Sequence, residues 1–123
     1  MKKILVVDDD CWILDACAQM LQFKNYDVNT AADVKEAKRK LEQKKFHMVI
    51  SDINLPGETG MELLIHIKQK FPGTGVIMMS GNPKISEDEC KRGGAFSYLR
   101  KPFDGNQFLS KVDAFFSKST IKK

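Results

Sequence analysis

Long hydrophobic segments are absent from this 123-residue sequence. A membrane-spanning helix needs about 20 consecutive apolar residues, but the apolar run Ile4–Val7 ends at Asp8 after four residues. The same run is too short for the hydrophobic part of a secretory signal peptide, which takes roughly 7–15 residues. We therefore expect a cytoplasmic protein without a membrane partner.

Cysteine is also scarce, with only Cys11, Cys17 and Cys90 in the chain. An odd number of cysteines without a secretory signal indicates reduced thiols rather than a disulfide scaffold. Cys11 stands next to a group of carboxylates, so a redox role stays open for it. A free cysteine usually behaves as a small apolar residue, which is the interpretation we favour.

Repeats, linkers and low-complexity stretches are missing as well, which indicates one folded unit. With 42% hydrophobic residues, the chain has enough apolar material for one packed core. We expect this domain to cover residues 1–118 and a loose basic tail to follow at 119–123.

The net charge of +4 is too small to single out a class of partner. Six basic residues do cluster between Lys35 and Lys45. No aromatic residues interleave with them and no recognition-helix motif accompanies them, so we interpret the cluster as the solvated face of a helix. We expect no direct nucleic-acid binding by this domain.

Five short runs read as strands, and segments with helical periodicity lie between and after them. The runs are Ile4–Val7, Asp27–Thr30, Met48–Ser51, Val76–Met79 and Phe96–Leu99. Three of them are nearly continuous apolar stretches, which is typical of strands covered on both faces. Among the helical segments, Glu87–Arg92 is shorter and has the weakest apolar periodicity.

Local signals mark where these helices begin and end. Several positions combine a capping side chain with Glu or Gln three residues later, as in a capping box. They are Asp33, Thr59, Ser86 and Asp104. Asn25 and Gly93 suit the left-handed backbone that ends many helices.

The alternation of strands and helices predicts an α/β protein with a doubly wound, five-stranded parallel sheet and helices on both faces. In such sheets, ligands bind beyond the carboxyl ends of the strands. The side chains that follow each predicted strand are therefore the candidates for a functional site.

Carboxylate, hydroxyl and amine groups follow four of the five predicted strands. In chain order they are Asp8, Asp9, Asp10, Asp52, Ser80 and Lys101. Carboxylates this close repel one another, so they need raised pKa values or a cation. Mg²⁺ suits them because it binds hard oxygen ligands, and Lys101 adds a positive charge that can reach an oxyanion. Asp10 is better placed to cap the first helix than to join the site.

In this order and at these strand ends, the residues resemble those of response-regulator receiver domains of two-component signal transduction. The resemblance rests on Asp8-Asp9, Asp52, Pro56 with Gly60, Ser80, Gly94-Ala95, Tyr98 and Lys101-Pro102. It extends from Ile4 to Phe116, which is nearly the whole chain. The resemblance implies a flavodoxin-like receiver fold with strand order 2-1-3-4-5 and five helices.

By this resemblance, Asp52 is the phosphoacceptor, and it takes the phosphoryl group of a phosphohistidine on a partner histidine kinase or phosphotransfer protein. Asp9 and Asp52 are expected to bind Mg²⁺ directly, together with the backbone carbonyl of Asn54. Asp8 is expected to act on the ion through water. Phosphoryl transfer then depends mainly on positioning and electrostatic stabilisation.

The resemblance also implies a switch. Ser80 and Lys101 are expected to contact phosphoryl oxygens, and movement of Ser80 is expected to open space that Tyr98 fills. The output surface is then formed by the helix at Glu87–Arg92, the fifth strand and the last helix. The bond between Lys101 and Pro102 is expected to be cis.

Two enzyme or carrier classes fit less well than a regulator. A phosphohydrolase of the haloacid-dehalogenase type also uses an aspartate nucleophile with Mg²⁺, but it wants a second acid where this chain has Asn54. A flavin-binding electron carrier is disfavoured because three aspartates would repel the flavin phosphate.

The remaining alternative is a pseudo-receiver that acts only as a binding module. The output partner stays open between an effector protein or domain and a homodimer formed on phosphorylation. The sequence also leaves open whether the chain is a stand-alone regulator or part of a longer protein.

Overall fold

Five parallel strands form the centre of the structure, which is a computed structural model that describes the backbone of residues 1–121 and the side chains of residues 1–117. The strands are β1 (Lys3–Val7), β2 (Asp27–Ala31), β3 (Met48–Asp52), β4 (Gly75–Ser80) and β5 (Ser97–Arg100). Their order in the sheet is β2-β1-β3-β4-β5, so the predicted topology is confirmed. Each predicted strand is present, with ends displaced by at most one residue.

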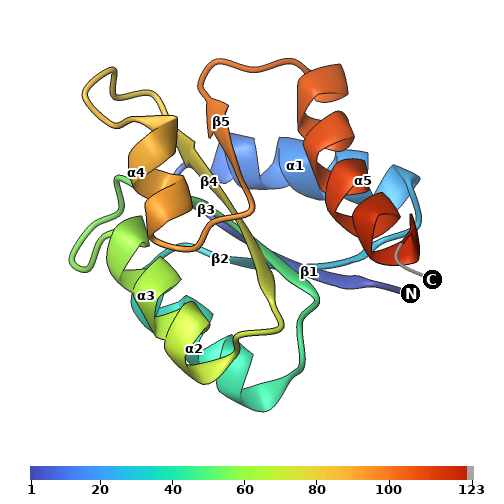
Figure 1. Ribbon diagram of the computed structural model, residues 1–123, viewed down its shortest axis with the longest axis horizontal. Helices are drawn as coiled ribbons and strands as arrows, with labels where there is room; N and C mark the ends of the chain where they lie inside the picture. The colour runs from blue at the N-terminus through green and yellow to red at the C-terminus, as the bar shows by residue number, and fades with distance from the viewer. Residues whose placement is uncertain (122–123) are drawn as a thin grey trace.

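Five helices cover the two faces of the sheet. They are α1 (Cys11–Phe23), α2 (Val34–Gln43), α3 (Gly60–Lys70), α4 (Glu87–Arg92) and α5 (Gly105–Ile121). Helices α1 and α5 lie on one face, and α2, α3 and α4 lie on the other (Figure 1). The division of the chain at residue 118 stays a prediction, because α5 overlaps the expected tail and residues 122–123 lie outside the described part.

The apolar core has two layers because side chains of a strand alternate between its faces. In β1, Ile4 and Val6 pack toward α1 and α5, whereas Leu5 and Val7 pack toward the other three helices. Strands β3 and β4 are buried at every position, which explains the apolar runs Met48–Ile50 and Val76–Met79 within them. Within residues 1–121, no helix is long and apolar enough to cross a membrane.

The capping signals are confirmed at the start of the helices. Thr59 and Glu62 form a complete capping box at α3, and Ser86 and Glu89 form another at α4. At α1, the side chain of Asp10 accepts a 2.9 Å hydrogen bond from the backbone N–H of Trp12. These bonds satisfy N–H groups that have no partner inside their own helix.

Helix α4 has the predicted bounds Glu87–Arg92, but the left-handed residue that follows it lies one position later than predicted. Asn25 does adopt the left-handed conformation after α1, with φ of 68°, but Gly93 keeps a helical φ of −76°. The left-handed residue is Gly94, with φ of 106°. The N–H of Ala95 then donates to the carbonyl of Cys90 at 3.0 Å, and that of Gly94 donates to Lys91, as in a Schellman motif.

Gly60 is the closest point of contact between α3 and the end of β3. Its N–H donates to the carbonyl of Ile53 at 2.8 Å. A Cβ atom at this position would overlap the backbone carbonyl oxygen of Asp52 and lie 2.8 Å from the Cα of Ile53. A hydrogen side chain is therefore required for α3 to begin where it does.

We predict that Gly60→Ala lowers the free energy of unfolding by at least about 1–3 kcal/mol, because backbone atoms must move to accept the methyl group. The matched control is Gly73→Ala, since a Cβ there meets no atom within 4 Å and the φ angle is not left-handed. Urea denaturation should show a change within about 1 kcal/mol for the control. Equal stability of the two variants would contradict this account of Gly60.

Candidate functional site

The carboxyl ends of four strands meet at one edge of the sheet, and the predicted polar residues lie there. Parallel pairing places Asp52 beside Met79 and Ser80 beside Arg100, so the residues that follow these strands are neighbours. Carboxylate oxygens of Asp8, Asp9 and Asp52 all lie within 4.8 Å of one another. The structure therefore brings these three side chains together although they come from segments far apart in sequence.

Lys101 completes the cluster from the segment after β5. Its Nζ lies 2.8 Å from Oδ2 of Asp8 and 3.4 Å from Oδ2 of Asp52. The side chains of Asp8 and Asp52 are buried, whereas that of Lys101 is 20% exposed. By formal charge, one ammonium group against three carboxylates leaves two negative charges uncompensated.

Burial and charge shape the protonation of this cluster. Burial raises the pKa of Asp52, and the nearby Lys101 ammonium only partly opposes that effect. Burial alone would lower the pKa of Lys101, but its hydrogen bond to Asp8 and the charge of Asp52 hold that pKa above its ordinary value. A carboxyl whose pKa is raised by folding binds its proton more tightly in the folded state, so ionised Asp52 destabilises the fold at neutral pH.

The three consecutive aspartates have different surroundings. Asp8 is fully buried, and its Oδ1 accepts the backbone N–H of Asp10 at 2.9 Å while its Oδ2 faces Lys101. Asp9 is exposed on the rim. Asp10 caps α1, as predicted. Asp8 is thus held by protein donors on both oxygens, and Asp9 faces solvent.

Ser80 and Tyr98 lie on either side of the segment that joins β4 to α4. The buried Ser80 Oγ accepts the backbone N–H of Asn82 at 2.9 Å. The Tyr98 side chain is buried within the core, and its hydroxyl donates to the carbonyl of Ile85 at 3.4 Å. Both side chains therefore contact the same loop, at its two ends.

The remaining predicted residues lie at the margin of the cluster. Asn54 is exposed, and its backbone N–H donates to Oδ1 of Asp52 over a long 3.4 Å. The peptide bond between Lys101 and Pro102 is cis, as predicted.

Two contacts around the site were missed from the sequence. The bond from Asp10 to Asp8 spans two residues, and the Asp-x-Asp pattern could have indicated it as an Asx turn. The ion pair between Lys38 on α2 and Glu58 in the loop after β3, at 2.9 Å, has no local signal because 20 residues separate its partners.

The cysteines have no evident role in this cluster. Cys17 is buried, and burial raises the pKa of its thiol to about 12, so it stays protonated. Cys11 is exposed beside the carboxylates as a free thiol. Its redox role stays a hypothesis.

Comparison with known proteins places this site in a family. Residues 4–113 match the family described as response regulator receiver domain. The alkaline phosphatase synthesis transcriptional regulatory protein PhoP of Bacillus subtilis is 33% identical over 123 residues, which are 98% of this chain and 50% of PhoP. The chain spans between about a quarter and a half of the length of curated relatives such as this one.

Solved structures agree with that match. A CheY-like response regulator receiver domain protein from Methanospirillum hungatei JF-1 has a TM-score of 0.93 and 33% identity, with 100% of this chain and 99% of that chain covered. The beryllofluoride-activated NtrC4 receiver domain dimer has a TM-score of 0.89 and 28% identity, with 96% of this chain and 98% of that chain covered.

We predict that Lys101→Met lowers the free energy of unfolding of the metal-free chain by about 1–3 kcal/mol, because it leaves buried carboxylates without their cation. The control is Lys84→Met, since Lys84 is exposed and forms no ion pair among the described residues. Urea denaturation in EDTA measures both.

The stability difference between Lys101→Met and wild type should narrow as the pH falls through the raised pKa of Asp52, because protonation then removes the uncompensated charge. A difference that is independent of pH would mean that Lys101 acts by packing rather than by charge.

Proposed function

This chain belongs to the response regulator receiver domain family, and we propose that it is a phosphorylation-activated switch that accepts a phosphoryl group on Asp52. The observation that carries the proposal is the convergence of Asp8, Asp9, Asp52 and Lys101 at one sheet edge. This arrangement offers an oxygen nucleophile, a cation for phosphoryl oxygens and a place for a metal. Its role is that of a phosphoacceptor regulator rather than an enzyme with a released product.

The donor set fits Mg²⁺. Three carboxylates offer hard oxygen ligands and two uncompensated negative charges, which match a divalent cation. Asp8 has protein donors at 2.9 and 2.8 Å on its two oxygens, which favours contact through water. The donors to Asp52 are longer, at 3.4 Å each, and Asp9 is exposed, so both of these carboxylates could bind the ion directly. The backbone carbonyl of Asn54 would complete the protein ligands. Bound Mg²⁺ would reduce the repulsion between the Asp52 carboxylate and an incoming phosphoryl group.

In the transfer step, an Asp52 carboxylate oxygen forms a bond to phosphorus while the bond from phosphorus to the donor's imidazole nitrogen breaks. The imidazole leaves with the electron pair of that bond. Lys101 is already within 3.4 Å of Asp52 and would pair with a phosphoryl oxygen. Preorganised charge of this kind stabilises the spread negative charge of the transition state.

The switch begins at Ser80. Its hydroxyl now accepts the N–H of Asn82 and would instead donate to a phosphoryl oxygen. Because Asn82 and Ile85 belong to one loop, a shift near Ser80 changes the contact made by Tyr98. Helix α4 follows this loop and has only six residues, so it moves at small energetic cost. The output surface would then be the face formed by α4, β5 and α5.

The partners follow from the proposed phosphoacceptor role. The phosphoryl donor would be a histidine kinase or phosphotransfer protein in the cytoplasm. The receiver of the signal would be an effector protein or domain, or a second copy of the chain. The activated NtrC4 receiver domain is a dimer, which supports the last option by analogy.

Phosphorylation tests the acceptor directly. We expect incubation with acetyl phosphate and Mg²⁺ to add about 80 Da, the mass of a phosphoryl group, to the intact chain. Asp52→Asn should remove the adduct while circular dichroism stays unchanged. Asp88→Asn, an exposed position on α4, is the control that keeps it. No adduct on the wild type would favour the pseudo-receiver, and an adduct on Asp52→Asn would place the acceptor elsewhere.

Metal binding can be measured separately. Mg²⁺ at 100 times its dissociation constant should stabilise the fold by about 2.7 kcal/mol, because it binds only the folded state. The stabilisation is measured as an increase in melting temperature on addition of Mg²⁺. Asp9→Ala should abolish most of this increase, whereas Asp15→Ala on the exposed side of α1 should keep it. Trp12, the single tryptophan, is 81% exposed beside the rim and provides a fluorescence signal for the titration. The same metal affinity in both variants would remove Asp9 from the ligand set.

A further inference from the structure

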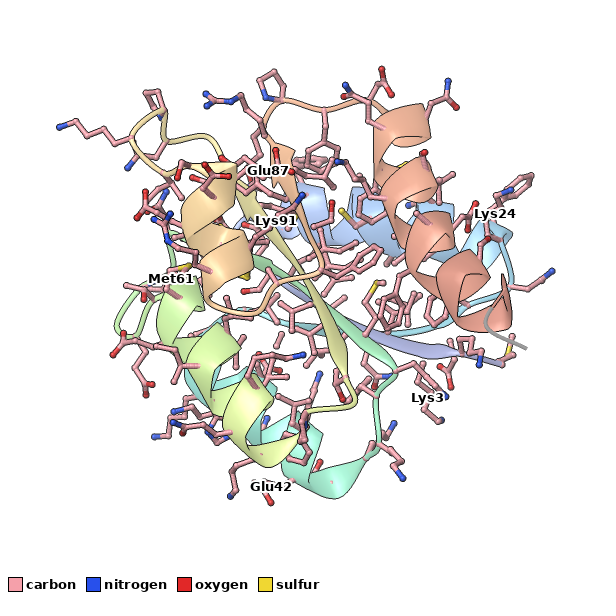
Figure 2. All side chains as sticks on the ribbon, in the orientation of Figure 1. Lys3, Lys24, Glu42, Met61, Glu87 and Lys91 are labelled. Carbon is pink, nitrogen blue, oxygen red and sulfur yellow. The ribbon has the colours of Figure 1, made fainter. Side chains whose placement is uncertain are left out.

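A second hollow lies at the opposite edge of the sheet, where the strands begin. It is an open hollow with a volume of about 850 Å³, bounded by the segments before β3 and β4 and by Phe115 and Phe116 of α5. In Figure 2, the labelled side chains of Lys3 and Glu42 lie toward this end of the molecule, and Glu87 lies toward the other. We call this hollow the basic-edge cavity. It shares no residue with the Asp52 site.

Positive charge dominates the lining of the basic-edge cavity. Its charged residues are Lys2, Lys44, Lys45, Lys70 and Glu42. The carboxylate of Glu42 is already paired with Lys70 at 3.1 Å. The ammonium group of Lys44 donates to the amide oxygen of Asn29 at 3.3 Å, and its charge helps to lower the pKa of Asp27. Within residues 1–117, none of Lys2, Lys44 and Lys45 forms an ion pair with a carboxylate.

Burial and the same positive charges lower the pKa of a histidine in the wall. Burial, followed by the charges of Lys2 and the N-terminal amine, lowers the pKa of His47. Its Nδ1 accepts the backbone N–H of Lys3 at 3.0 Å, which also requires an unprotonated nitrogen.

Aromatic rings supply the apolar part of the wall. Phe71 follows α3, and Phe115 comes from α5; both are half-buried and both line the cavity. The neighbouring Phe116 has the ammonium group of Lys2 5.8 Å from its ring centroid. A planar apolar group could lie against such rings while an attached anion reaches the lysines.

Helix dipoles explain part of this charge but not all of it. Lys44 is the C-cap of α2 and Lys70 is in the last turn of α3, where cations are favoured by the helix dipole. Lys2 precedes β1, so no helix dipole favours a cation at its position.

We propose that the basic-edge cavity binds a nucleotide-sized phosphorylated compound, with its phosphates among Lys2, Lys44 and Lys45 and its base against Phe71. This open hollow is large enough to hold a compound of that size. The acidic edge repels such an anion when no metal is present, so the two ends of the sheet select for opposite charges. This proposal does not rest on phosphoryl transfer to Asp52.

The test is titration of the ¹⁵N-labelled chain with ADP in EDTA, which keeps Mg²⁺ away from the acidic edge. We expect saturable shifts in the amide signals of residues 44–47 and 71–74. The double variant Lys44→Gln/Lys45→Gln should weaken binding at least about tenfold, which corresponds to one lost charge-assisted contact. The control Lys35→Gln/Arg39→Gln removes the same charge from the solvent face of α2 and should bind as the wild type does.

Two simpler probes separate the parts of the site. Pyrophosphate alone and adenosine alone should each bind more weakly than ADP, and ADP should raise the pKa of His47 because a nearby anion favours the imidazolium ion. Pyrophosphate binding as tightly as ADP would refute the role of the aromatic wall. Absence of saturation, or equal loss in both double variants, would show only general attraction to a basic surface and would overturn the proposal.

Discussion

Repulsion among the carboxylates of Asp8, Asp9 and Asp52 is the constraint on which the rest of this structure depends. Three like charges at one edge would push apart the strands that carry them, so the sheet beneath must hold them in place. The buried, two-layered packing of β1, β3 and β4 does this, and Lys101 offsets part of the charge. The site is therefore maintained in a state that favours cations, at the expense of some stability of the metal-free chain.

Parallel topology explains how the site is assembled from few residues. Every strand in the sheet ends at the same edge, so four of them contribute a side chain to one place without any long loop. The close approach of Gly60 to Asp52 then starts α3 directly behind the site. Cap residues act in the same way at α1, where Asp10 both begins the helix and holds Asp8.

Most of the fold was predictable because its signals are local. Strands buried on both faces need continuous apolar runs, and capping boxes join residues three apart, so both are legible in the sequence. The clustering of Asp8, Asp9, Asp52 and Lys101 could be predicted because these residues stand at strand ends. Asn54 and Tyr98 entered the prediction only through the resemblance. The pair Lys38 and Glu58 and the choice of Gly94 over Gly93 could not be found, since they depend on how separate helices meet. The basic-edge cavity is likewise assembled from distant segments and has no local pattern.

The separation of an acidic edge from a basic edge has a consequence for motion in solution. Charges of opposite sign at the two ends of the sheet contribute to an electric dipole moment along the strand direction. A charged partner that approaches within a Debye length, about 10 Å at 0.1 M salt, exerts a torque on this dipole. The chain is then rotated before the first collision, so productive encounters become more frequent at low ionic strength.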